Sequence, residues 1–143
     1  YHKDLLTTFA SVANKLSMEH ALIVHGFDGL DEITITDSTY ITELKNKEIT
    51  HYEISPKDFG LSLANISEIS AQSADDSLLL VREAFAGEQS AVQDMIALNA
   101  GAALYLAGSV SSIADGVELS FTLMNNGMAA DKLAAYVRIS NNS

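Results

Sequence analysis

The apolar run at residues 21–24 (ALIV) constrains the fold more than any other stretch of the chain. It shows no polar alternation, a pattern typical of a strand that is covered on both faces, as in a parallel sheet. Such a strand needs neighbours, and the chain offers no second fully apolar strand to lie beside it. We therefore expect its partner strands to come from elsewhere, which predicts that the chain is a piece of a larger α/β domain.

The segments around this run predict a helix before it and a hairpin after it. Apolar residues recur with the 3.6-residue period of an amphipathic helix over residues 3–16. Residues 33–36 alternate Ile and Thr, and two β-rich runs, 40–44 and 49–54, flank the polar turn 45–48. We expect two antiparallel strands in a hairpin, with a third strand, 33–36, leading in.

From residue 73 onward the chain reads as helices. Three of them begin at a serine suited to capping a helix N-terminus and end at a glycine suited to the turn after a helix. The pairs are Ser73 with Gly87, Ser90 with Gly108, and Ser112 with Gly127. The middle helix, 91–107, is rich in alanine and glycine, which lets another backbone come close to it. A last helix is expected over residues 130–139.

Composition narrows the classes of function. The chain has 143 residues, with 19 acidic and 8 basic side chains and a formal charge of −11. This excess of acid argues against nucleic acid as a partner, because binding to phosphates needs clustered Lys and Arg. The absence of cysteine excludes disulfides, thiolate zinc sites and a cysteine nucleophile, and fits a reducing compartment. No apolar run is long enough to span a bilayer, so we predict a cytoplasmic protein with no membrane partner.

The segment directly after the apolar run departs from ordinary packing patterns. It places three carboxylates, Asp28, Asp31 and Glu32, beside the glycines Gly26 and Gly29. Loops at the carboxyl ends of strands are where α/β sheets usually bind ligands. The crowded carboxylates repel one another, unless solvent or a cation such as Mg²⁺ relieves the repulsion. From these residues alone two interpretations stay open, a solvated acidic turn that leads into the hairpin and a Mg²⁺ site.

The same segment, residues 25–32 (HGFDGLDE), resembles the HG-x-DGLDE motif of the anthranilate phosphoribosyltransferases. Further segments resemble that family in the same order: 53–61 (EISPKDFGL), 98–101 (LNAG) and 115–117 (DGV). The resemblance implies an α/β fold, with a mixed sheet, a β-hairpin and flanking helices. In this interpretation residues 1–143 are the C-terminal part of the family's large α/β domain, without its N-terminal helical domain and phosphate-binding loop.

The resemblance also implies a reaction, a cofactor and site residues. Family enzymes transfer the phosphoribosyl group of phosphoribosyl diphosphate to anthranilate in tryptophan biosynthesis, with the help of Mg²⁺. Asp31 and Glu32 correspond to the acidic pair that holds Mg²⁺ against the diphosphate. The rest of the motif forms a supporting loop of His25, Gly26, Asp28 and Gly29. No catalytic residue is assigned here, and we expect the isolated chain to be inactive because the family's phosphate-binding loop belongs to another segment.

Two other interpretations stay open. One is a relative of the pyrimidine nucleoside phosphorylases, against which the intact DGLDE segment argues. The other is a non-catalytic binding domain, which only the missing phosphate-binding loop supports. For the full-length enzyme the resemblance implies a homodimer, and we expect the shorter chain to self-associate through surfaces that the missing segments would cover.

Overall fold

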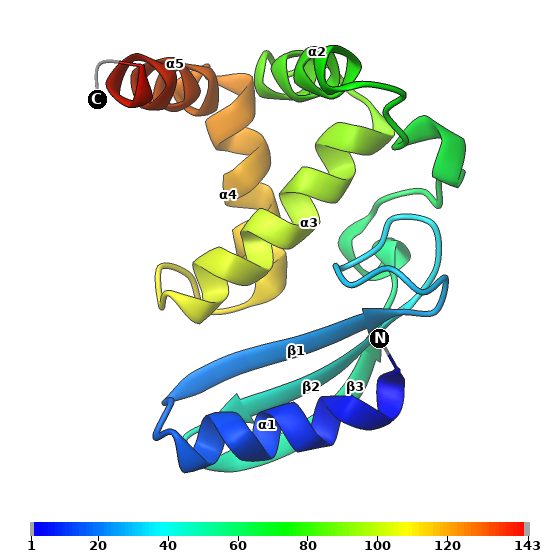
Figure 1. Ribbon diagram of the computed structural model, residues 1–143, viewed down its shortest axis with the longest axis vertical. Helices are drawn as coiled ribbons and strands as arrows, with labels where there is room; N and C mark the ends of the chain where they lie inside the picture. The colour runs from blue at the N-terminus through cyan, green and yellow to red at the C-terminus, as the bar shows by residue number, and fades with distance from the viewer. Residues whose placement is uncertain (1, 142–143) are drawn as a thin grey trace.

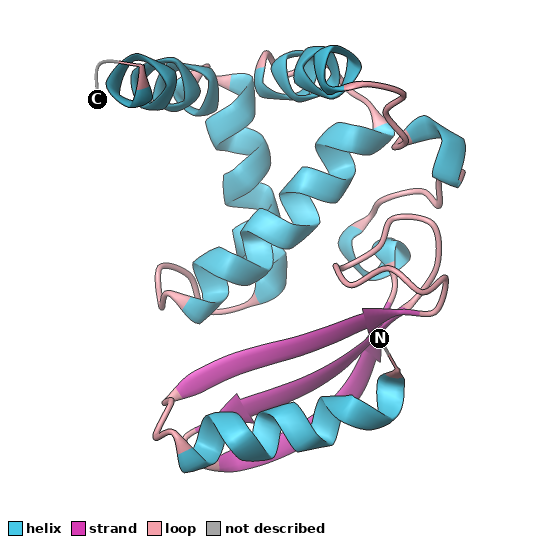
Figure 2. Ribbon diagram, in the orientation of Figure 1, coloured by secondary structure: helices cyan, strands magenta, loops and turns pink. Residues whose placement is uncertain are grey.

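The computed structural model describes residues 2–141 and arranges them as a sheet with helices on both sides (Figures 1 and 2). The strands are β1 (His20–Gly26), β2 (Thr39–Lys45) and β3 (Glu48–Ile54). The α-helices are α1 (Leu6–Lys15), α2 (Ala74–Phe85), α3 (Ala91–Leu106), α4 (Ile113–Asn125) and α5 (Met128–Ser140). Short 3-10 helices cover Lys3–Leu5, Pro56–Phe59 and Ile66–Glu68.

The sheet has the order β1-β2-β3, and both pairings are antiparallel. The α/β class, the hairpin and the flanking helices are confirmed, but residues 2–141 form an antiparallel sheet in place of the expected mixed one. The expectation that residues 21–24 lack a partner in this chain was wrong, because β1 pairs with β2 along its whole length. The central strand is β2, whose polar residues Thr39, Thr42 and Glu43 are buried. Because of these polar residues, β2 does not show the fully apolar pattern typical of a buried strand.

The hairpin between β2 and β3 turns as expected from the sequence. Asn46 and Lys47 have φ angles of 52° and 70°. Two successive residues with positive φ are the mark of a type I′ turn, whose twist matches that of the strands it joins. The third strand of the sheet is β1, however, and residues 33–36 form no strand at all. They are an irregular segment in which Ile33, Thr34 and Ile35 are buried.

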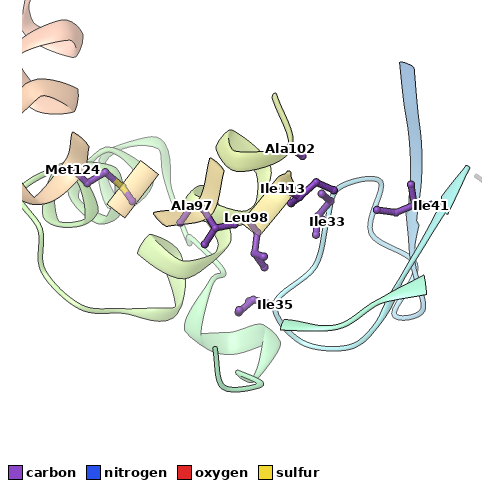
Figure 3. Close-up of a cluster of buried hydrophobic side chains, with 9 residues drawn as sticks. Ile33, Ile35, Ile41, Ala97, Leu98, Ala102, Ile113 and Met124 are labelled. Carbon is purple, nitrogen blue, oxygen red and sulfur yellow. The ribbon is translucent and has the colours of Figure 1, made fainter. Parts of the chain in front are cut away.

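The helices lie on the two sides of the sheet. In Figures 1 and 2, α1 lies along one side while α3 and α4 lie on the other. The main core lies between the sheet, the 27–38 loop and the α3–α4 pair, and Figure 3 shows its side chains. Its buried members are Ile33, Ile35, Ile41, Ala97, Leu98, Ala102, Ile113, Val117 and Met124.

The predicted helix caps are confirmed. Ser73, Ser90 and Ser112 each accept a hydrogen bond from the backbone N–H three residues later. Gly87, Gly108 and Gly127 follow the same helices with positive φ. The small residues of α3 also have the expected use, because Gly101 meets Gly116 of α4. A Cβ atom on Gly116 would lie 2.3 Å from the Gly101 carbonyl oxygen, so the two backbones are in direct contact.

Helix α1 leaves part of its apolar stripe uncovered. Leu6, Ala10 and Ala13 are buried. Phe9 and Val12 of α1, with Leu5 just before the helix and Leu16 just after it, are between 42 % and 72 % exposed. Among the described residues no strand pairs with the outer edge of β1. Within residues 2–141 no helix has the length and apolar character needed to cross a membrane.

Candidate functional site

The candidate site is the turn that follows β1. The Gly29 N–H donates to the Gly26 carbonyl oxygen at 3.0 Å, and the Gly26 N–H donates to the Leu30 carbonyl oxygen at 2.8 Å. A Cβ atom at Gly26 would lie 2.4 Å from Asp28 Oδ1, so only glycine lets this carboxylate close over the turn. Gly29 has a φ of 93°, a conformation that costs glycine little. Both glycines of the motif therefore shape the turn.

Asp28 ties the two ends of this loop together. Its Oδ1 accepts the Leu30 N–H at 3.1 Å, and its Oδ2 accepts the hydroxyl of Thr34 at 2.6 Å and that of Thr36. Partial burial raises the pKa of the Asp28 carboxyl, but these hydrogen bonds outweigh burial and leave the pKa below its ordinary value. Asp28 is thus an ionised structural acceptor, in keeping with a supporting role.

Asn99 of α3 holds the segment that follows the loop. Its Oδ1 accepts the Ile33 N–H at 3.0 Å, while its Nδ2 donates to the Ile33 carbonyl oxygen at 2.8 Å and to the Met95 carbonyl oxygen at 3.0 Å. The Thr34 N–H donates to Thr39 Oγ1 at 3.1 Å. Side chains thus satisfy several of the backbone groups that a neighbouring strand would otherwise bind, and the Ala64 N–H donates to the Ile35 carbonyl oxygen at 3.1 Å, which explains why residues 33–36 need not form a strand.

Asp31 and Glu32 lie between these two anchors and are both exposed. Within residues 2–141 neither carboxylate makes a hydrogen bond or an ion pair. Glu32 and Asn99 line the same open pocket of about 330 Å³, with Met95 and Ile69 on its wall. The described residues contain no cluster of three or more His, Cys, Asp or Glu side chains able to hold a metal ion.

Two adjacent free carboxylates suit one kind of metal. Mg²⁺ commonly takes one or two protein carboxylates and completes its octahedron with waters and substrate phosphates. Asp31 and Glu32 provide two exposed carboxylates, the number that such a site takes from the protein. A metal that needs a complete protein cage would find too few ligands among the described residues.

His25 and Phe27 flank the start of the turn. His25 is in β1 opposite Tyr40, and the Phe27 ring stacks on the Tyr40 ring with centroids 3.9 Å apart. Of the predicted supporting residues, Gly26, Asp28 and Gly29 form the hydrogen-bonded turn that precedes Asp31 and Glu32, and His25 lies in β1 just before this turn. Sequence reasoning gave no part in the site to Thr34, Thr36 or Asn99. The sequence feature that could have pointed to Asn99 is its place in the LNAG segment, which lies far along the chain from Ile33, the residue that Asn99 binds.

A second polar cluster lies at the other end of the sheet, near the start of β1. Glu43 of β2 accepts the hydroxyls of Tyr105 and Tyr52, each at 2.8 Å, and its Oε1 lies 2.8 Å from His20 Nε2. Burial raises the pKa of Glu43, but the hydrogen bonds from Tyr105, His20 and Tyr52 outweigh it and lower the pKa. This cluster joins the sheet to α3, and it contains none of the loop residues.

A comparison with protein families identifies the family of this chain. Residues 1–130 match the model of the glycosyl transferase family, a/b domain. The chain belongs to this family. Curated relatives in the family include the anthranilate phosphoribosyltransferase of Halorhodospira halophila, 44 % identical over 137 residues, or 96 % of this chain and 40 % of the relative. Another is that of Vesicomyosocius okutanii, 42 % identical over 138 residues, or 96 % of this chain and 41 % of the relative.

Solved structures of the family agree with the fold. The anthranilate phosphoribosyltransferase of Thermus thermophilus matches with a TM-score of 0.87 at 27 % identity, over 96 % of this chain and 40 % of that one. That of Saccharomyces cerevisiae in complex with PRPP and Mg has a TM-score of 0.87 at 19 % identity, over 100 % of this chain and 42 % of that one. The chain therefore spans about two fifths of the length of the relatives that it matches.

Proposed function

We propose that this chain is part of an anthranilate phosphoribosyltransferase, which transfers the phosphoribosyl group of phosphoribosyl diphosphate to anthranilate in tryptophan biosynthesis. The observation that carries the proposal is the HGFDGLDE loop, which leaves Asp31 and Glu32 exposed and unbonded within residues 2–141. The similarity to curated relatives of that name supports it. Residues 1–143 would be the C-terminal part of the family's α/β domain, and the N-terminal helical domain and the phosphate-binding loop would lie outside them.

In this proposal Asp31 and Glu32 hold Mg²⁺, a metal that the structure of the Saccharomyces cerevisiae relative contains together with PRPP. The ion would neutralise the charge that grows on the diphosphate as it leaves. The chain's own part is to keep two carboxylates together without a cationic side chain that would compete for them. Asp28 contributes by closing the turn, because its hydrogen bonds to Leu30 and Thr34 hold the chain on both sides of the pair.

We infer a homodimer for the full-length enzyme and self-association for the 143-residue chain, for which the exposed stripe of α1 offers a surface. We expect no nucleic acid or membrane partner, and a cytoplasmic location. The isolated chain should not form phosphoribosyl anthranilate, because catalysis here depends on positioning two substrates and their other contacts lie in other segments.

The test is an assay of the complete polypeptide that carries this chain, with anthranilate, phosphoribosyl diphosphate and Mg²⁺. Loss of anthranilate fluorescence should require all three components, and Asp31→Asn or Glu32→Gln should lower the rate and raise the Mg²⁺ concentration needed. Asp37→Asn is the matched control, since Asp37 is an exposed carboxylate of the same loop. Phosphorolysis of a pyrimidine nucleoside without consumption of anthranilate would overturn the proposal in favour of the phosphorylase-like alternative.

A further inference from the structure

The acidic pair Asp31–Glu32 is bracketed by two side-chain anchors that differ in kind. On one side Asp28, from the loop itself, binds Leu30 and Thr34. On the other side Asn99 reaches across from α3 to Ile33. We propose that Asn99 is a positioning residue for the metal and diphosphate site, and that it acts by fixing the backbone next to Glu32. This inference deepens the proposed function and rests on it.

The geometry of Asn99 suits this role. Its amide engages both polar groups of one residue, because the Ile33 N–H binds Oδ1 and the Ile33 carbonyl oxygen binds Nδ2. The third hydrogen bond, from Nδ2 to the Met95 carbonyl oxygen, fixes the amide against its own helix. The Asn99 side chain therefore cannot rotate without breaking contacts at both ends, and it transmits the position of α3 to the loop.

The support behind Asn99 is rigid. Leu98, its neighbour on α3, is fully buried, and Ile33 is 2 % exposed. Both belong to the same buried cluster, which also contains Ile113 of α4 (Figure 3). Ile33 is thus held by its side chain in the core and by its backbone on Asn99. The backbone of Glu32, one residue earlier, is therefore attached to a fixed residue.

The pair has little freedom between its two anchors. Only Gly29, Leu30, Asp31 and Glu32 separate Asp28 from Ile33, and the Leu30 N–H is itself bound to Asp28. A ligand pair held in place before binding loses less conformational entropy when it captures its ion. Outer contacts that orient metal ligands typically change metal affinity by about 10- to 100-fold when they are removed.

A purely structural role for Asn99 is the alternative, and the chain offers a matched control for it. Gln93 also lies on α3, is buried, and donates to the Ala84 carbonyl oxygen at 3.3 Å and to Asn125 Oδ1 at 3.2 Å. It joins helices to one another and makes no hydrogen bond to the described residues of the loop. Replacing Gln93 should weaken the fold without moving Glu32. Replacing Asn99 should both weaken the fold and move Glu32.

The experiment compares the wild type with Asn99→Ala, Asn99→Ser and Gln93→Ala in the complete polypeptide. Amide hydrogen exchange at Ile33 is measured without metal, and Mn²⁺ affinity is measured by electron paramagnetic resonance with phosphoribosyl diphosphate present. We expect Asn99→Ala to speed exchange at Ile33 and to weaken Mn²⁺ binding by about tenfold or more. Asn99→Ser keeps one hydrogen-bonding group and should fall between Asn99→Ala and the wild type, while Gln93→Ala should keep wild-type affinity.

The following results would overturn the positioning role of Asn99. Wild-type Mn²⁺ affinity in Asn99→Ala overturns the inference, and so does an equal loss in Gln93→Ala, which would mean that general destabilisation is the cause. If Asn99→Ala does not fold, wild-type affinity in Asn99→Ser overturns it as well. A wild-type protein that binds no Mn²⁺ with phosphoribosyl diphosphate would overturn the proposed function first, and this inference with it.

Discussion

Replacing Gly116 by alanine tests whether the close approach of α3 and α4 stabilises the fold. An added Cβ at this position would lie 2.3 Å from the carbonyl oxygen of Gly101 and 2.8 Å from its Cα. The obstructing atoms are backbone, so no side-chain rotation can remove the clash. The two helices would have to move apart by roughly 1 Å to restore ordinary contact, and the small core residues beside them would lose contacts.

Two opposing effects set the size of the change. Forcing extra volume into a packed core typically costs about 1–3 kcal/mol, and a clash between two backbones belongs at the upper end of that range. Replacing glycine by alanine within a helix stabilises it by up to about 1 kcal/mol. We therefore expect a net loss of about 2 kcal/mol in the free energy of unfolding. For a chain of this length that corresponds to a fall of roughly 6–10 °C in melting temperature.

The assay is urea unfolding followed by far-ultraviolet circular dichroism. Glu118→Gly and Glu118→Ala, at an exposed position of the same helix, measure the intrinsic preference of α4 for alanine. Gly101→Ala should also destabilise the protein, since its Cβ would lie 2.6 Å from the Val117 nitrogen. The double variant should lose less than the sum of the single losses, because both changes open the same contact. A Gly116→Ala protein as stable as the wild type, or more stable, would refute the reasoning.

The remaining predictions concern carboxylates. Glu43→Gln should lower the free energy of unfolding at pH 7 by about 1–3 kcal/mol. The pKa of Glu43 is lowered in the folded state, so its contribution to stability is present above pH 4.5 and is lost as the pH falls further. Urea unfolding at pH 7 and at about pH 3 should therefore show that the variant and the wild type differ in free energy of unfolding at pH 7 and converge at the lower pH. Asp94→Asn should have the opposite effect at pH 7, because burial raises the pKa of Asp94 and its ionised form opposes folding; calorimetry should find a higher melting temperature at pH 7 and no difference near pH 3. Asp31→Asn or Glu32→Gln should change the melting temperature by no more than a few degrees, since exposed loop carboxylates carry little packing energy, and a fall of many degrees would show that the pair is structural.

The local elements could be predicted because their signals lie within a few residues. A serine cap bonds to an N–H three positions along the chain, as Ser90 does to Gln93. The turn at Asn46 and Lys47 depends on the backbone of two residues. The exposed carboxylates of Asp31 and Glu32 could be located in a loop because three acidic residues and two glycines crowd into residues 26–32, whereas their role in holding a metal stays a prediction.

The sequence could not tell which segment would be the central strand. The rule that a buried strand is apolar favoured residues 21–24 and passed over β2, where Glu43 is only 8 % exposed. Glu43 tolerates burial because Tyr52, Tyr105 and His20, which belong to three different elements, bond to it. Those partners exist only once the sheet and α3 have come together.

The sequence by itself determined where the three serine-capped helices begin and end, where the hairpin turns and which loop carries the exposed carboxylates of Asp31 and Glu32. Only the tertiary structure decided how the buried backbone of residues 33–36 is satisfied. The alternation of Ile and Thr over residues 33–36 predicted a strand with one buried face, but Ile33, Thr34 and Ile35 are all buried, and hydrogen bonds other than those of a sheet satisfy their backbone. The N–H and carbonyl groups of Ile33 bind Asn99, a residue 66 positions away. A contact of that kind leaves no periodic trace in the sequence, and it exists only when packing sets α3 beside the loop.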